Sequence, residues 1–379
     1  MSRTSVHDAR TQSGAPGEVW SSPRRARALL VAGVAAAGIA LAGCGASSGS
    51  GSGSSATSGS DAAATGKAPK TVPLGIYCAS SCQSALKLGV APASVKGKVA
   101  FIDDATSFPY GATQFTKTQT EAKKYFPNMQ VKVLNGNNDP TTESNELNTV
   151  VDEGYKVVIL DAVVRDALGP ATQLAIKKGV KVIEIDRTVD APVLTTIKAP
   201  DVALGTKEMD FVAKQMHGHG NIVILSGTPG ASPTIDRTAG IQAALKKYPG
   251  IHVLTNVNGN YTTGDAFTAV QSLLSRYPAG HFTWLVSEAD AMTLGAVKAI
   301  QAAHRTDIKI ASIDGQNEAL AILGKNGFEG DVVYPIVVPA DLVAAAKALV
   351  GEAMPKHIGL EYPLVTTKNV KTYAGTNFG

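Results

Sequence analysis

Cysteine and net charge are both scarce in this sequence. It has three cysteines among 379 residues, too few for a cysteine-rich metal centre. Lys and Arg number 35, and Asp and Glu number 31. Residues 1–43 contain five Arg and two acidic residues, which leaves 30 basic against 29 acidic residues in the remainder. A body this close to neutral argues against binding to nucleic acid.

Motifs of common enzyme classes are also missing from the body of the chain. The run Ser-Gly-Thr-Pro-Gly at 226–230 lacks the Lys-Ser/Thr ending of a phosphate-binding loop. We find no Gly-x-Ser-x-Gly elbow and no His-Glu-x-x-His pair there. His217 and His219 could form a metal pair, but their Gly-rich surroundings after a helix favour a C-terminal turn. We therefore predict a protein that is not an enzyme and needs no cofactor or metal.

The first 43 residues have the pattern of an export signal. Arg24, Arg25 and Arg27 precede an apolar stretch, residues 28–42, that is too short to span a membrane comfortably. The stretch ends Leu-Ala-Gly-Cys44, which resembles the lipobox of bacterial lipoproteins. This resemblance implies that residues 1–43 are removed and that Cys44 carries lipid, which anchors the protein on the outer side of the cell membrane.

Two further segments precede the body. Residues 44–70 are rich in Gly, Ser and Ala, a composition that cannot bury a core and is typical of a flexible tether. Residues 71–97 form an N-terminal extension that contains Cys78 and Cys82. Two nearby cysteines in an oxidising compartment are expected to form a small disulfide loop.

From residue 98 onward, apolar segments alternate with helical ones. We expect strands at 99–102, 131–134, 157–160 and 182–185, with helices at 110–126, 141–153 and 166–178 between them. After residues 197–200 the alternation restarts, with helices at 202–216, 233–248, 264–276, 290–303 and about 318–325. Its strands are expected at 222–225, 252–254, 282–285, 308–311 and 332–334. Strands separated by helices of this size indicate right-handed crossovers and parallel sheets.

We therefore predict an α/β protein with two similar doubly wound parallel-sheet lobes joined by hinge strands. One lobe comprises residues 98–199 plus 339–359, and the other comprises residues 200–338 plus 360–375. Loops at the carboxyl ends of two such sheets form a cleft where ligands bind. Asp186 and Arg187 directly follow one strand and are expected to hold a small polar molecule there. The alternative is a surface ion pair, which contributes little to stability.

Six motifs then occur in the order found in the ribose-binding-protein family, the sugar-type solute receptors of ABC importers. They are residues 107–111 (SFPYG), 186–187 (DR), 236–240 (DRTAG), 260–261 (NY), 290–296 (DAMTLGA) and 312–315 (SIDG). Over residues 98–366 the chain therefore resembles the type I periplasmic binding proteins, which have the two-lobed fold predicted above.

The resemblance implies a site in which aromatic rings cover a sugar-like ring and charged groups pair with its hydroxyls. Implied partners are a small polar solute such as a sugar or polyol, and an ABC permease. The expected ligand contacts are Asp104, Phe108, Tyr110, Asp161, Asp186, Arg187, Arg237, Tyr261, Glu288, Asp290 and Asp314.

Two departures from the family pattern affect the expected ligand. Ala289 stands where the family usually has Asn, and Val337 where it often has Gln. A polyol, a deoxy or smaller sugar, or a ligand with a cationic group therefore fits better than ribose or galactose. Two other functions stay open: a sensing subunit for a membrane signalling protein, and an enzyme acting on a small polar substrate. A transcription regulator of this fold is disfavoured, because a lipobox rather than a helix-turn-helix precedes the body.

Overall fold

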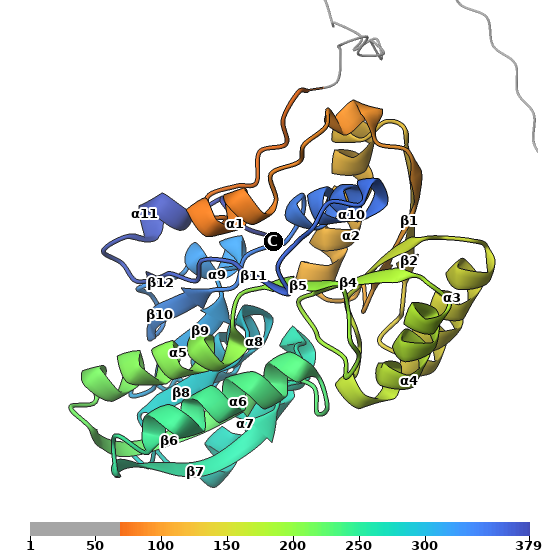
Figure 1. The fold of residues 1–379 in the computed structure, drawn as a ribbon. Coiled ribbons are helices and arrows are strands. Elements are labelled where there is room, and N and C mark those ends of the chain that lie inside the picture. Colours follow the sequence, from red (N-terminus) through yellow and green to blue (C-terminus); the bar gives the residue numbers. More distant parts are fainter. Residues whose placement is uncertain (1–68) are drawn as a thin grey trace, which may run out of the picture. The chain divides into compact units, whose positions relative to one another are not determined.

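The computed structural model describes residues 69–379 (Figure 1). The predicted leader, the predicted lipid site at Cys44 and nearly all of the predicted tether lie outside the described residues. Among the helices that are described, none combines the length and the apolar character needed to cross a bilayer.

The first sheet has six parallel strands in the order β11-β5-β4-β3-β1-β2. Alternate side chains of β1 point to opposite faces: Phe101 packs with α2 and α10, and Ile102 packs with α3 and α4. The strands are β1 (Gly97–Asp103), β2 (Met129–Asn135), β3 (Val157–Leu160), β4 (Lys181–Ile185), β5 (Thr195–Lys198) and β11 (His357–Gly359). The helices are α2 (Pro109–Tyr125), α3 (Pro140–Asp152), α4 (Arg165–Lys177) and α10 (Ala340–Val350).

The second sheet has the order β12-β10-β9-β8-β6-β7, and only β12 pairs antiparallel. Ile224 packs toward α5 and α6, and Leu225 packs toward α7 and α8. Helices α5 and α6 lie side by side (Figure 1). The strands are β6 (His219–Ser226), β7 (Gly250–Asn258), β8 (Trp284–Ser287), β9 (Lys309–Asp314), β10 (Phe328–Val333) and β12 (Leu364–Val365). The helices are α5 (Asp201–Gln215), α6 (Ser232–Leu245), α7 (Thr263–Arg276) and α8 (Asp290–Ala302).

Both sheets follow the doubly wound order 2-1-3-4-5, extended by one late strand. The order reverses between β1 and β3 in one sheet and between β6 and β8 in the other, which is where such sheets bind ligands. Over the described residues the chain passes between the sheets at 199–200, at 334–339 and at 360–363. The predicted fold of two parallel α/β lobes is confirmed.

Several predicted element boundaries are wrong. The helix expected at about 318–325 is only α9 (Asn317–Leu320). The chain turns after it because Gly324 and Gly327 adopt positive φ angles, and a Cβ on Gly327 would lie 2.3 Å from the carbonyl oxygen of Ile308. Sequence patterns also missed β5 and β11, which are short strands paired to each other at the edge of the first sheet.

The N-terminal extension packs onto the first lobe and also reaches the end of the chain. It contains α1 (Ser80–Ala85) and the 3₁₀ turn η1 (Pro92–Ser94). A disulfide joins Cys78 to Cys82, and both cysteines are buried in the core of the first lobe. Tyr77 stacks on Tyr373 of α11 (Val370–Tyr373) with 6.4 Å between ring centroids.

Candidate functional site

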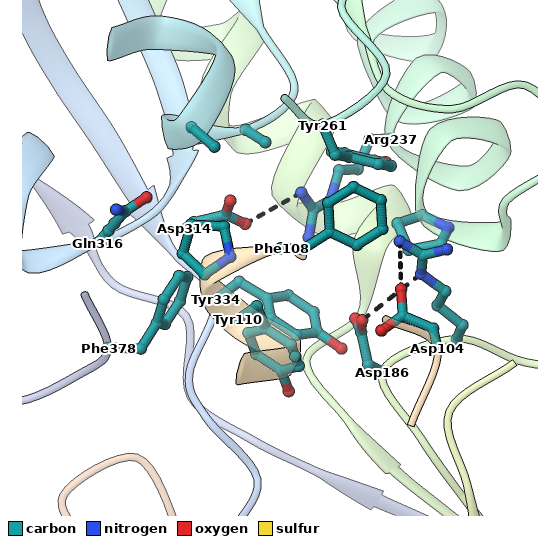
Figure 2. A pocket seen from close by; sticks show the side chains of 16 residues that line it. Asp104, Phe108, Tyr110, Asp186, Arg237, Tyr261, Asp314, Gln316, Tyr334 and Phe378 are labelled. Atoms are coloured by element: carbon teal, nitrogen blue, oxygen red, sulfur yellow. Dashed lines mark hydrogen bonds and ion pairs between the residues drawn. The ribbon is translucent and has the colours of Figure 1, made fainter. Parts of the chain in front are cut away.

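A cavity of about 50 Å³ lies among the carboxyl ends of strands from both sheets (Figure 2). The lining residues lie at or after the carboxyl ends of β1, β4, β6, β7, β8, β9 and β10, and one of them, Phe378, follows α11. Eight residues that the sequence identified as ligand contacts line it: Asp104, Phe108, Tyr110, Asp186, Arg187, Arg237, Tyr261 and Asp314. The structure thus brings together groups from both lobes that are up to 210 positions apart in the sequence.

Arg187 is the charged centre of the first-lobe side. Its Nη2 lies 2.8 Å from Oδ2 of Asp104, and its Nη1 donates to the carbonyl oxygen of Val163 at 3.1 Å. The ring of Phe108, from the first lobe, and the ring of Tyr261, from the second, both contact the guanidinium group. Each ring centroid lies 5.6 Å from the guanidinium carbon, a cation–π distance. This packing fixes the direction of the guanidinium group.

The electrostatics of this side come from buried carboxylates around one cation. Burial raises the pKa of Asp104 to about 6, although Arg187 opposes the shift. Burial lowers the pKa of Arg187, but Asp104, Asp161 and Asp186 together raise it above its ordinary value. Oxygens of Asp103, Asp104 and Asp161 lie within 4.8 Å of one another and could hold a cation. Arg187 already supplies one positive charge at this cluster.

A buried carboxyl group next to this cluster predicts a pH dependence of stability. Glu143 is fully buried, and its Oε2 accepts from the backbone N–H of Val163 at 2.8 Å. Burial raises its pKa from 4.5 to about 8. Between these values the folded protein holds a proton that the unfolded chain releases, so the free energy of unfolding falls as the pH rises from 4.5 to 8.

Glu143→Gln is expected to remove this part of the dependence. It should raise the free energy of unfolding at pH 8 by about 1.4 kcal/mol or more, the equivalent of one pKa unit, and change it little at pH 4.5. Urea unfolding at both pH values measures the effect. Glu361→Gln, at an exposed position, serves as the control and should change neither value. A Glu143→Gln protein that is less stable at pH 8 would contradict the prediction.

Arg237 is the corresponding centre of the second-lobe side. Its Nε donates to Oδ1 of Asp201 at 2.8 Å, and its Nη1 lies 3.1 Å from Oδ1 of Asp314 (Figure 2). The ring centroid of Tyr334 lies 5.0 Å from the guanidinium carbon. Asp201 is also paired with Lys198. Arg237 is therefore held by two carboxylates and an aromatic ring before any ligand arrives.

Three lining residues adopt backbone conformations that are unusual for their type. The φ angle is 48° at Asp186, 59° at Tyr261 and 134° at Asp314. Such conformations cost about 1–3 kcal/mol each and persist where the surrounding structure enforces them, often at binding sites. Tyr261 also lies directly against Gly227, where a Cβ would come within 1.9 Å of its ring. Only glycine leaves room for the ring at that position.

Three predicted contacts, Asp161, Glu288 and Asp290, do not line the cavity. They lie behind its wall and bind the backbone of the segments that form it. Asp161 accepts from the N–H of Arg187 at 3.3 Å, Glu288 from that of Gly227 at 3.0 Å, and Asp290 from that of Gln316 at 2.7 Å. Burial raises the pKa of Glu288 to about 7.

Sequence patterns did not identify Gln316, Tyr334 and Phe378, whose side chains also line the cavity. The first two follow β9 and β10, so their position at strand ends could have indicated them. Phe378 lies beyond the last strand and helix, in a segment without a periodic pattern. The hydroxyl groups of Tyr110 and Tyr334 are buried and have no hydrogen-bond partner among the described residues.

The two lobes also contact each other beside the cavity. Arg165 of the first lobe and Asp236 of the second form an ion pair, with 2.8 Å between Nη2 and Oδ2. The N–H of Thr188 donates to Oγ of Ser232 at 2.8 Å. The lobes are therefore held together across the cavity by polar contacts.

Comparison with known proteins identifies the family. Residues 99–352 match the family model described as a periplasmic binding protein domain. The chain belongs to this family. This periplasmic binding protein is 30% identical to the xylitol-binding protein of Mycolicibacterium smegmatis over 246 residues, which cover 64% of the chain and 70% of that protein. It is 23% identical to the ribose import binding protein of Haemophilus influenzae over 289 residues, 75% of the chain and 97% of that protein.

Solved structures confirm the type I fold. The Caulobacter myo-inositol binding protein, bound to myo-inositol, superposes with a TM-score of 0.69 and 24% identity, and the match covers 73% of the chain and 95% of that protein. A galactofuranose binding protein also gives 0.69, at 22% identity, over 74% of the chain and 98% of that protein. Together with the family match and the ribose import binding protein, these structures confirm the predicted resemblance to the ribose-binding-protein family. The lipoprotein form stays a prediction.

Proposed function

We propose that the protein is an extracytoplasmic solute receptor that captures a small polyol or sugar between its two lobes and delivers it to an ABC importer. The observation that carries this proposal is the composition of the cavity wall. Two arginines that already have buried partners, three aspartates and several aromatic rings surround one small cavity at the switch points of both sheets.

The chemistry of the wall suits a ligand with several hydroxyl groups. Asp186 can accept hydrogen bonds, because its nearest cationic atom, Nε of Arg187, is 3.9 Å away. The unpartnered hydroxyls of Tyr110 and Tyr334 can both donate and accept. Aromatic faces supply apolar contact for C–H groups. We infer that a polyhydroxylated ligand completes these hydrogen bonds.

A polyol is the ligand class we favour. The relative with 30% identity is named for xylitol, and a myo-inositol binding protein shares the fold. Ala289 lines the cavity where the family usually has Asn, whereas Val337 is buried outside the lining. A wall with fewer amide contacts than a ribose site therefore fits a ligand that differs from ribose.

The capture mechanism we infer is hinge closure. Periplasmic binding proteins close around their ligands by hinge motion. We assign the hinges to the three passages of the chain between the sheets, and we place the lobes at residues 98–199 plus 339–359 and at 200–338 plus 360–375. A ligand that contacts both lobes only when they are closed shifts the population toward the closed state. Lipid on Cys44 would keep the receptor at the membrane, close to its permease.

A ligand screen tests the proposal. Purified protein is heated with xylitol, other pentitols, myo-inositol, ribose, galactose and amino sugars in turn, and hits are measured by isothermal titration calorimetry. We expect at least one polyol or sugar to raise the melting temperature, because binding to the folded state alone adds RT ln(1 + [L]/Kd) to its stability. If no probe shifts the melting temperature and one of them is chemically converted, the receptor function is wrong.

Measurements in cells distinguish a role in import from a role in sensing. Loss of the receptor should abolish uptake of the radiolabelled ligand if it serves a permease. Unchanged uptake, with a lost transcriptional response to the ligand, would favour a sensing subunit instead.

A further inference from the structure

The final residues of the chain form one wall of the cavity. After α11, residues 374–379 run back along the second lobe to the carboxyl ends of β9 and β10. The N–H of Asn317 donates to the carbonyl oxygen of Phe378 at 2.7 Å, and the N–H of Gly375 donates to Oδ1 of Asn317 at 2.9 Å. Nδ2 of Asn317 also donates to the carbonyl oxygen of Gly379 at 3.2 Å, so three hydrogen bonds attach the segment to the start of α9.

Asn377 fixes this segment to two residues of the cavity wall. Its Nδ2 donates to the carbonyl oxygen of Asp314 at 2.8 Å and to that of Tyr334 at 2.9 Å. Its Oδ1 accepts from the N–H of Ile336 at 2.9 Å. The Asn377 amide thus uses three of its four hydrogen-bonding positions, and its side chain is buried. The next residue is consequently held in one place.

That next residue, Phe378, turns its ring into the cavity. The side chain is 2% exposed and lines the cavity at the end opposite Asp104 (Figure 2). Its ring meets the ring of Tyr110 edge to face, with 5.3 Å between centroids and 88° between planes. Because Tyr110 belongs to the first lobe, Phe378 contacts both lobes when they are closed.

We propose that Phe378 is a specificity-determining residue that sets the upper size of the ligand. The cavity is about 50 Å³, so little free space remains beside the ring, and the segment behind it cannot withdraw without breaking the Asn377 hydrogen bonds. A ligand that carries one ring more than a single polyol or sugar would overlap the position of the Phe378 phenyl group. The inference rests on the proposed function, since it concerns the ligand of the same site.

A pair of substitutions near the end of the chain tests this. Phe378→Ala removes the phenyl ring from the cavity. Tyr373→Ala removes a ring of α11, directly before the segment, that stacks on Tyr77 outside the cavity, and it serves as the matched control. Dissociation constants are measured by calorimetry for two sets of probes. The small set is xylitol, ribose and myo-inositol, and the large set is the phenyl glycosides of xylose and ribose and the disaccharide xylobiose.

We expect Phe378→Ala to weaken the best small probe about 10-fold, through lost apolar contact, and to strengthen at least one large probe 10-fold or more. Tyr373→Ala should leave the ratio of the affinity for large probes to that for small probes unchanged. Phe378→Leu, which fills part of the space, should give an intermediate ratio and replaces the alanine variant if that variant does not fold.

An unchanged ratio in both the alanine and leucine variants would overturn the proposal, as would an equal change in Tyr373→Ala. If the wild-type protein binds small probes and the Phe378 variants keep the same ratio of affinities for large and small probes, the size limit is wrong and the proposed function stands. If the wild-type protein binds none of the probes, the proposed function fails, and the size limit fails with it.

Discussion

Replacing Arg187 by alanine is expected to weaken ligand binding at least about 30-fold. The substitution removes the only cation within reach of Asp104 and Asp186 among the described residues. A charge-assisted hydrogen bond from Arg187 to the ligand is expected to contribute about 2–3 kcal/mol to binding, and 1.4 kcal/mol corresponds to a factor of ten. Calorimetric titration with the ligand found in the screen measures the loss.

Two further variants make this result specific. Arg187→Lys keeps the charge but loses the planar fork, so its affinity should lie between the wild type and Arg187→Ala. Asp186→Asn keeps the shape, and Asn tolerates the φ of 48° at this position as well as Asp does. It should fold normally and bind more weakly by about 10-fold or more, because a hydrogen bond to a charged group contributes about 1.5–3 kcal/mol. Undiminished binding by Arg187→Ala would exclude the residue from the site.

Replacing Arg237 by methionine is expected to have the largest effect on stability. Asp314 would lose the cation paired with it, Asp201 would keep only Lys198, and both carboxylates are largely buried. Breaking a buried ion pair by removing one partner costs about 3–5 kcal/mol, because the remaining charge is left uncompensated. Urea unfolding should show this loss of free energy in the absence of ligand.

The control for size and charge is Arg276→Met, at an exposed position on α7, which should change the stability by no more than about 0.5 kcal/mol. Adding Asp314→Asn to Arg237→Met should restore part of the lost stability, since one uncompensated charge is then removed. A double variant with a lower free energy of unfolding than Arg237→Met would contradict this account.

Local sequence patterns are sufficient for the fold because each lobe repeats one unit. Val157–Leu160 is apolar at every position and is bounded by helices of crossover length, so a central parallel strand is the natural interpretation. The pattern fails at β5 and β11, whose few residues include Thr, Lys and His. β5 forms because it pairs with β4, and β11 forms because it pairs with β5, which local composition does not reveal.

The site is only partly predictable for a related reason. Residues after a parallel strand are expected at the binding edge of the sheet, which indicates Asp186 and Asp314. The position after a strand does not tell which way a side chain points, and Asp161 lies behind the wall although it directly follows β3. Phe378 could not be found, because its place depends on the tertiary hydrogen bonds of Asn377 rather than on any periodic pattern.

The discontinuous first sheet has a consequence for the order of folding. Its edge strand β5 gains its partner β11 only when residues 357–359 exist, and β3 and β4 are covered on one face by α10. Both elements follow all the parallel strands of the second sheet in the chain. Until they are made, β5 presents an unpaired edge, which is a hazard for aggregation. The first lobe begins first in the sequence but is completed only after all the parallel strands of the second sheet have been made.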